Sequence, residues 1–294
     1  MRADTRAQLH RAVLNWYAEQ GRALLWRRLP AEPYQVLVRE VMLQQTQVTR
    51  VERLLPSFLE RFPTLEALAA APLSEVIRWW QGLGYNRRAR LLWACARKIV
   101  QQHGGQIPSE PAVLQQLPGI GAYTAAAIAT FAFGRHDVPV VDGNVRRVLE
   151  RLWGEELPMR MLVQRAAEWI PHGASERWHQ ALMDIGALYC RKRAPRCSEC
   201  PLQRWCRTAH RGVHAKPLAQ KSEPQFNGIP RRLWRGRLLR LVAKAGRVTL
   251  EEAAAVLFGT PPTPQQRRWL RTVADALVQE GLLRRQAQWL ALPD

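Results

Sequence analysis

Long hydrophobic runs, acidic side chains and alternating strand patterns are all scarce in this sequence of 294 residues. No run of about 18 apolar residues occurs, which excludes a membrane-spanning helix. The first ten residues, MRADTRAQLH, are polar and lack the apolar stretch of a secretory signal. We therefore expect a soluble, cytoplasmic protein with no membrane partner.

The shortage of acidic residues leaves the chain strongly basic. It has 24 Asp and Glu against 44 Lys and Arg, which gives a formal net charge of +20. Such a charge is expected when the partner is a polyanion, either nucleic acid or an anionic membrane surface. Hydrophobic residues make up 47% of the chain, so extensive disorder is excluded, and the length suits one large domain or two small ones.

Alternating polar and apolar residues, the pattern of a half-buried strand, are missing before the C-terminal region. Apolar residues instead recur at helical spacings, as in Thr5–Gln20, Pro72–Gly82, Arg87–His103 and Val163–Ile170. The sequence therefore predicts an all-α fold with short connections.

The composition changes towards the C-terminus. Residues 212–228 are polar, contain Pro and Gly, and lack helical periodicity. We therefore expect a linker there, between a domain at residues 1–211 and a smaller one at residues 229–294.

The smaller domain has helical patterns at Pro230–Ala245, Val248–Phe258 and Thr263–Glu280, followed by a segment that suits a two-stranded wing at Leu282–Leu292. This order is typical of a winged helix-turn-helix module. Its first helix carries many arginines, which predict either a phosphate-binding surface or simply a solvated basic face. They are Arg231, Arg232, Arg235, Arg237 and Arg240.

Cysteine is rare, and four of the five cysteines share one short segment. Cys190, Cys197, Cys200 and Cys206 are separated by six, two and five residues. In a reducing compartment this cluster predicts a metal site rather than disulfides, with an iron–sulfur cluster or a structural zinc as the alternatives. Nearby basic residues favour the thiolate form that a metal requires. Cys95 lies in an apolar helical stretch and is expected to be a buried thiol.

The segment Leu117-Pro118-Gly119-Ile120-Gly121 precedes a helix of small residues at Tyr123–Thr130. Its glycines permit backbone conformations closed to other residues, and they let the backbone approach a ligand closely. Amides beside a helix N-terminus then form an anion site that suits a DNA phosphate. An isolated Pro-Gly-x-Gly would favour an ordinary interhelical turn, but here further motifs follow in order.

Farther along lies Val140-Val141-Asp142-Gly143-Asn144, where the Asp could simply cap a helix. The order of hairpin, glycine, spacer and Val-Asp-Gly-Asn, with the cysteine segment after it, nevertheless resembles the helix-hairpin-helix glycosylases of the endonuclease III and MutY superfamily. The resemblance covers about residues 5–208. It implies a two-lobed fold with a structural [4Fe-4S] cluster on the four cysteines, and a small winged-helix-like domain follows it.

The same resemblance gives roles to the residues of this motif. It implies that Asp142 is essential, because its carboxylate stabilises the cationic sugar that forms as the N-glycosidic bond breaks. Asn144 would orient that carboxylate. Arg146 and Arg147 would lie towards the DNA backbone phosphates.

The string REVMLQQTQV runs from Arg39 to Val48, with Glu40 as its second residue, and resembles the MutY motif. Endonuclease III homologues lack a Glu at this position. Removing adenine requires protonation at N7, which calls for a carboxylic acid in a dry pocket. The resemblance implies that Glu40 is this general acid and then activates water. Gln44 would fill the gap left by the flipped base, and Val48 would lie in the base pocket.

Other positions refine the resemblance. Tyr123 stands where endonuclease III homologues carry a Lys that attacks the sugar, and Tyr cannot form that Schiff base, so we predict a monofunctional glycosylase. Gly82-Leu83-Gly84-Tyr85, followed by Arg87, resembles the MutY segment whose Tyr enters DNA beside the base opposite the target. Trp26 and Arg27 resemble the pair that flanks the family's pocket.

The resemblance implies that the chain removes adenine mispaired with 8-oxoguanine or guanine from double-stranded DNA in base excision repair. We expect a nucleoid-associated monomer. Two alternatives stay open: another mismatch glycosylase on the same scaffold, such as a G:T enzyme with the same Tyr, and a non-enzymatic DNA-binding regulator. About 65 residues follow the linker, too few for the Nudix-like domain with which many MutY enzymes recognise 8-oxoguanine.

Overall fold

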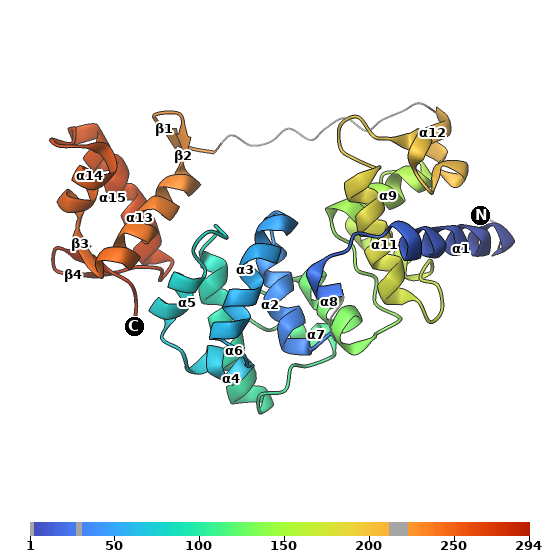
Figure 1. The fold of residues 1–294 in the computed structure, drawn as a ribbon, viewed down its shortest axis with the longest axis horizontal. Helices are drawn as coiled ribbons and strands as arrows, with labels where there is room; N and C mark the ends of the chain where they lie inside the picture. The colour runs from blue at the N-terminus through green and yellow to red at the C-terminus, as the bar shows by residue number, and fades with distance from the viewer. Residues whose placement is uncertain (1–2, 28–30, 212–222) are drawn as a thin grey trace. The chain divides into compact units, whose positions relative to one another are not determined.

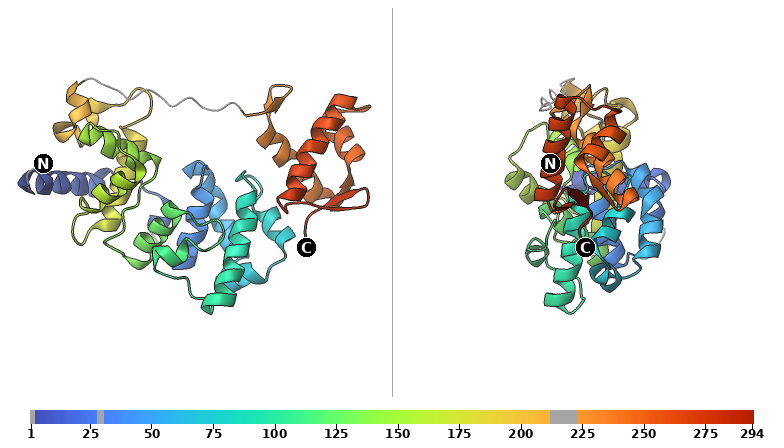
Figure 2. Two further views of the ribbon diagram at one scale, coloured as in Figure 1. Left: turned by 180° about the vertical axis from the view of Figure 1, so that it is seen from behind. Right: turned by 90° about the vertical axis from the view of Figure 1, so that its left-hand side faces the viewer.

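The computed structural model describes residues 3–27, 31–211 and 223–294, and it is predominantly helical (Figure 1 and Figure 2). The all-α prediction is confirmed for the described residues before Gln225, since the strands of the described residues all lie after residue 224. Most of the predicted linker, residues 212–222, lies outside the described residues. Among the helices that the structure describes, none has the length and apolar character to cross a membrane.

The chain forms two compact units from non-contiguous segments, and each is described by itself. The first contains the described residues of 1–36, 109–115 and 120–219. Its elements are α1 (Ala3–Gln20), η1 (Leu25–Arg27), the start of α2 (Pro33–Leu43), α7 (Pro111–Leu114), α8 (Ala122–Phe133), α9 (Gly143–Trp153), α10 (Met159–Ala167), α11 (Ser175–Leu188), η2 (Cys197–Glu199), η3 (Gln203–Trp205) and α12 (Arg207–Arg211).

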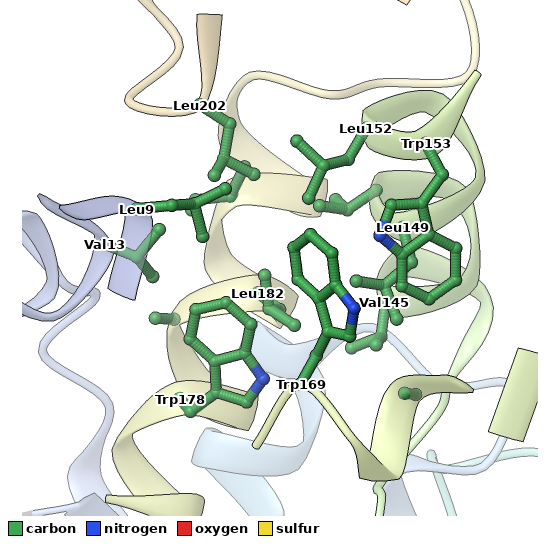
Figure 3. Packing of buried hydrophobic residues seen from close by; sticks show 14 of the residues in the cluster. Leu9, Val13, Val145, Leu149, Leu152, Trp153, Trp169, Trp178, Leu182 and Leu202 are labelled. Carbon is green, nitrogen blue, oxygen red and sulfur yellow. The ribbon is translucent and has the colours of Figure 1, made fainter. Parts of the chain in front are cut away.

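Three helices of this unit, α1, α9 and α11, pack around one apolar cluster (Figure 3). Leu9 of α1, Leu149 of α9 and Trp178 of α11 are fully or almost fully buried in it. Trp153 and Trp169 meet edge to face in the same cluster, with ring centroids 5.4 Å apart. Aromatic burial of this kind dominates core energetics, so it fixes α9 and the residues at its N-terminus.

The second unit contains residues 37–108, 116–119 and the described residues of 220–294. Helix α4 packs along α6, and Phe58 of α3 contacts both Phe62 and Trp80. The elements before residue 109 are the rest of α2, α3 (Val48–Arg61), α4 (Leu65–Ala70), α5 (Leu73–Trp79) and α6 (Arg87–His103).

The C-terminal part of this unit has the element order of a winged helix, which confirms the sequence-based fold class. Strands β3 (Arg247–Thr249), β5 (Trp289–Ala291) and β4 (Arg284–Gln286) form an antiparallel sheet in that spatial order. We call residues 223–294 the C-terminal module. Its elements are β1 (Gln225–Phe226), β2 (Ile229–Pro230), α13 (Arg231–Ala245), β3 (Arg247–Thr249), α14 (Leu250–Phe258), α15 (Pro264–Gln279), β4 (Arg284–Gln286) and β5 (Trp289–Ala291).

Some predicted helix limits differ from the observed ones for local reasons. Helix α5 ends at Trp79, because Gly82 and Gly84 turn the chain with φ of 95° and 73°. Helix α14 begins at Leu250 rather than Val248, because Val248 pairs with Leu290 in the sheet. Phe226, within the predicted linker, stacks on Trp269, so the described module starts before residue 229.

Candidate functional site

Glu40 is buried near the end of α2, with only 3% of its surface exposed. Arg39 is buried beside it, and its Nε donates to Glu40 Oε1 at 3.1 Å. A charge is tolerated in such a place only when it is paired and hydrogen-bonded. Glu40 is therefore not the solvent-facing residue of an ordinary amphipathic helix, and its carboxyl lies in a water-poor environment.

The turn after α2 contacts the predicted hairpin. Gln44 Nε2 donates to the carbonyl oxygen of Gly119 at 3.3 Å. Gly119 has a φ of 79°, and a Cβ there would lie 2.9 Å from Leu91 Cβ on α6. Only glycine meets both conditions without strain, so the close approach of hairpin and helix depends on it. Leu117 is buried and supports the turn from inside.

Arg88 of α6 connects α2 with the loop that carries Tyr85. Its guanidinium donates to the carbonyl oxygens of Val41 and Met42, both at 2.8 Å, to Thr46 Oγ1 at 2.8 Å and to Gly84 O at 3.1 Å. The last carbonyls of a helix lack partners within it, so this arginine caps α2. Burial lowers the pKa of Arg88 to about 10. The sequence did not single out this residue.

The Tyr85 side chain is exposed to solvent, while hydrogen bonds fix the backbone beside it. Its side chain is 49% exposed and its φ is 45°. The Arg88 guanidinium lies 5.6 Å from the Tyr85 ring centroid, and Trp80 Nε1 donates to Gly84 O at 3.2 Å. Tyr85 therefore stands on an exposed turn, with Arg87 exposed two residues on and Val48 half-buried at the start of α3.

In the first unit, Asp142 occupies the N-cap of α9. Its Oδ1 accepts from the amides of Asn144 and Val145 at 2.8 and 2.7 Å, and its Oδ2 accepts from Asn144 Nδ2 at 3.0 Å. The amides and the positive end of the helix stabilise the negative charge. Capping and the predicted orientation by Asn144 therefore coexist.

Arg147 is held by partners within the protein, unlike the expectation that it lies towards DNA phosphates, while the same expectation for Arg146 stays a prediction. Arg147 Nη2 donates to Asn144 Oδ1 at 2.8 Å and to Gly186 O at 2.7 Å, and its Nε donates to Cys190 O at 2.5 Å. Burial lowers its pKa. Arg146 instead pairs with Glu150 at 2.9 Å. A chain of hydrogen bonds thus runs from Asp142 to the cysteine segment. Asn144 donates to Asp142 and accepts from Arg147, and Arg147 also donates to the carbonyl oxygen of Cys190.

The four clustered cysteines form no disulfide, and three of them pack against the apolar cluster of this unit. Arg151 Nη1 lies 3.4 Å from Cys190 Sγ, and the Arg151 carbonyl lies 3.4 Å from Cys206 Sγ. Burial raises the pKa of the Cys200 thiol to about 12, and the charges of the other three cysteines add to that rise. Four cysteines whose charges act on one another suit a cationic centre that would hold them as thiolates. In the described residues no group of three metal-binding side chains is already arranged around a metal position.

The remaining candidates also lie in the first unit. Arg27 Nη1 and Nη2 donate to both oxygens of the fully buried Asp184, at 2.7 and 3.1 Å. Arg22 Nε donates to the same carboxylate at 2.6 Å. Sequence reasoning missed Asp184, which holds the η1 turn with Trp26. Tyr123 is half-buried in the first turn of α8, behind the exposed Gly121.

Comparison with known families and structures agrees with this geometry. The profile described as "HhH-GPD superfamily base excision DNA repair protein" matches residues 38–172. A thermostable thymine-DNA glycosylase aligns with a TM-score of 0.67 and 28% identity over 71% of this chain and 98% of that one. An endonuclease III–DNA complex aligns with a TM-score of 0.61 and 23% identity over 71% and 96%. The fold therefore defines a base excision DNA repair class.

Sequence relatives narrow the class. The adenine DNA glycosylase of Mycolicibacterium smegmatis is 39% identical over 272 residues, which cover 91% of this chain and 92% of the relative. The human adenine DNA glycosylase is 41% identical over 225 residues, or 72% of this chain and 41% of the human one. The chain thus belongs to the HhH-GPD superfamily, in its MutY-type adenine DNA glycosylase branch. The mycobacterial match covers more than residues 1–222 alone, so that relative shares at least part of the C-terminal module.

Proposed function

We propose that this protein is an adenine DNA glycosylase of base excision repair, which releases adenine mispaired with 8-oxoguanine or guanine from duplex DNA. The observation that carries this proposal is the burial of Glu40, which is 3% exposed near the end of α2. Gln44 follows that helix directly and donates a hydrogen bond to Gly119 in the hairpin. The adenine DNA glycosylases among the relatives support the choice of base.

Glu40 acts as the general acid. Adenine is a poor leaving group as an anion, and a proton given to its N7 lets it leave as a neutral base. Glu40 is then ionised and accepts a proton from the water that attacks C1′ of the sugar. Arg39 Nε, at 3.1 Å from Glu40 Oε1, stabilises the ionised form in the buried site.

Asp142 stabilises the positive charge that develops on the sugar as the N-glycosidic bond lengthens. Its orientation is fixed before DNA binds, because one oxygen accepts from two amides and the other from Asn144. Water supplies the hydroxyl of C1′, and the products are free adenine and an abasic site. Tyr123 offers no amine for a Schiff base, so the DNA strand stays intact.

DNA is held by the hairpin and the loop before α6. Gly119 and Gly121 leave backbone amides near the start of α8 for a phosphate, and Leu117 supports their turn. The exposed Tyr85, with Gln44, fills the space of the flipped base, and Arg87 contacts the backbone. Trp26, Arg27 and Val48 are the candidates for contact with the base.

In this proposal the thiolates of four cysteines would hold a [4Fe-4S] cluster: Cys190, Cys197, Cys200 and Cys206. When bound, the cluster supplies a structural cross-link and a cationic centre for the four thiolates. Arg151 contacts Cys190 Sγ and so supports the charge of that thiolate. A visible absorption band near about 400 nm in the purified protein distinguishes the cluster from zinc.

We also propose that a glycosylase domain at residues 1–211 is followed by a winged-helix-like domain that begins before the predicted residue 229 and includes Phe226, in a protein that acts as a monomer. The cytoplasmic, nucleoid-associated localisation follows from its substrate.

Single-turnover base release tests the proposal, with duplexes that hold A or T opposite 8-oxoguanine, G or C. We expect release of adenine opposite 8-oxoguanine and G. Glu40→Gln and Asp142→Asn should each slow release by about 1,000-fold or more while DNA affinity changes little. Variants with full rates would contradict the mechanism.

A thymine mismatch glycosylase is the second candidate, because a thymine-DNA glycosylase is among the structural neighbours at 28% identity. It predicts release of T opposite G and none of A. The regulator alternative predicts binding with no release from any duplex.

A further inference from the structure

The C-terminal module contains a helix-turn-helix whose second helix faces solvent. Helices α14 and α15 follow one another and lead into the β4–β5 hairpin. One side of α15 is buried in the core of the module through Leu270, Val273, Ala274 and Leu277. The opposite side is exposed, and in helix-turn-helix proteins this second helix is the one that contacts DNA.

The exposed side of α15 carries side chains suited to a nucleic acid. Gln265, Arg268, Arg271 and Thr272 are all exposed and lie on the side away from the buried residues. Arginine, glutamine and threonine are the common donors to phosphates and base edges. This surface, which we call the α15 face, therefore has the chemistry to contact a duplex.

Two of its cations are not neutralised within the protein. Arg267 pairs with Glu251 at 2.8 Å, and Arg285 of β4 pairs with Asp275 of α15 at 2.6 Å. Arg268 and Arg271, in contrast, have no carboxylate within ion-pair distance among the residues that the structure describes. Unpaired arginines on a rigid helix attract a polyanion, since each can release a counterion from DNA.

The module packs against the part of the unit that carries the candidate DNA-contacting loop. Leu73 and Ile77 of α5 belong to the same apolar cluster as the module's own core. Arg90 of α6 packs against Gly281, where a Cβ would lie 3.3 Å from Arg90 Cδ. Arg90 is one helical turn after Arg87, so the end of α15 lies next to the start of α6, immediately after Tyr85.

We propose that the α15 face is a second DNA-binding surface, which contacts the phosphates of duplex DNA flanking the mispair. Glu40 and Asp142 act at one nucleotide, and the α15 face binds the neighbouring duplex. The partner is DNA because the chain carries a net charge of +20 and the module adjoins the loop already assigned to DNA. The inference rests on the proposed function only in that the substrate is duplex DNA.

A row of cations on α13 offers an internal control for this choice of surface. Arg237, Arg240 and Lys244 are exposed on the same side of α13. They carry similar charge in the same module, but they lie on the first helix, outside the helix-turn-helix. If DNA were attracted only by the overall positive charge of the module, substitutions on the two surfaces would therefore weaken DNA binding equally.

The test compares two full-length double variants, Arg268→Ala with Arg271→Ala and Arg237→Ala with Arg240→Ala. Affinity for an undamaged labelled duplex is measured by fluorescence anisotropy at several salt concentrations. We expect the α15 variant to bind about tenfold more weakly and to reduce the slope of log K against log salt by about 2, one for each lost phosphate contact. The α13 variant should retain the wild-type affinity and slope.

Footprinting on a long duplex with a central A:8-oxoguanine pair supplies the position. The α15 variant should lose protection on one flank only, while protection at the mispair remains. Equal losses for the two variants, or an unchanged slope for the α15 variant, would overturn the proposal. Because binding to undamaged DNA needs no base release, failure of the adenine chemistry would appear separately, in the single-turnover assay.

Discussion

At the scale of single residues, the side chains that hold the candidate site are as informative as those that would react. Arg88 makes hydrogen bonds to five different partners, including two carbonyls at the end of α2 and Gly84 beside Tyr85. It is buried, so its charge depends on every one of these partners. One residue therefore fixes the relation between the helix of Glu40 and the loop of Tyr85.

We predict that Arg88→Met destabilises the protein by about 3 kcal/mol, because five acceptors lose their donor in a buried place. Denaturant unfolding followed by tryptophan fluorescence measures the change. Arg87→Met is the matched control: Arg87 is exposed, so its unfolding free energy should change by less than about 0.5 kcal/mol. Similar small changes for both variants would mean that the Arg88 contacts contribute little to stability.

The sequence predicted the positions of the candidate acids better than it predicted their surroundings. Glu40 and Asp142 stand in short motifs, so their place on a helix and at a helix start follows from adjacent residues. Arg88 and Asp184 carry no such local signal, because their partners are up to 162 residues away in the chain. The inward turn of Arg147 was missed for the same reason: its acceptors lie on α11 and in the cysteine segment.

At the scale of elements, the approach of α11 to α9 sets the position of Asn144. A Cβ on Gly186 would lie 2.5 Å from Asn144 Cβ, a distance that folded proteins essentially never show. Gly186 is buried, and its carbonyl accepts from Arg147, so neither helix can move away without breaking the chain of hydrogen bonds to Asp142.

Gly186→Ala should therefore displace Asn144 and slow base release by about tenfold to 100-fold, with a loss of stability of about 1–3 kcal/mol from overpacking. Single-turnover rates at saturating enzyme measure the first effect and denaturant unfolding the second. Gly143→Ala provides the comparison, since a Cβ there would meet nothing within 4 Å. An unaltered release rate for Gly186→Ala would show that the position of Asn144 does not matter for the reaction.

Element limits were predictable where the punctuation is local. Helix α6 spans Arg87–His103 as expected, because Gly104 ends it in the left-handed conformation with a φ of 59°. Strand β3 was not predictable, since Arg247–Thr249 is extended only because it pairs with Trp289–Ala291, far along the chain. Thr249 then caps α14 in a capping box with Glu252, which moves the helix start beyond Val248.

At the scale of the whole molecule, the C-terminal module was expected to be a separate domain after a linker, whereas its apolar core includes Leu73 and Ile77 of α5. Leu73 is 4% exposed and Ile77 is fully buried. Composition alone could not reveal this contact, because the pattern of α5 indicates only which of its residues are apolar and not what covers them. The module therefore contributes to the stability of the unit that contains Glu40.

A chain that ends at residue 211 should accordingly be less stable than the full chain. Uncovering Leu73 and Ile77 costs about 3–6 kcal/mol, at about 1.5–3 kcal/mol for each side chain returned to water. We expect a lower melting temperature and binding of a hydrophobic dye by the shortened chain. Leu73→Ser with Ile77→Ser in the full chain removes the same contacts while the module stays attached, so it should reproduce most of the loss. If the shortened chain instead melts at the wild-type temperature without binding dye, the module does not stabilise the unit that contains Glu40. Its contacts with α5 and Arg90 then contribute nothing to the free energy of unfolding.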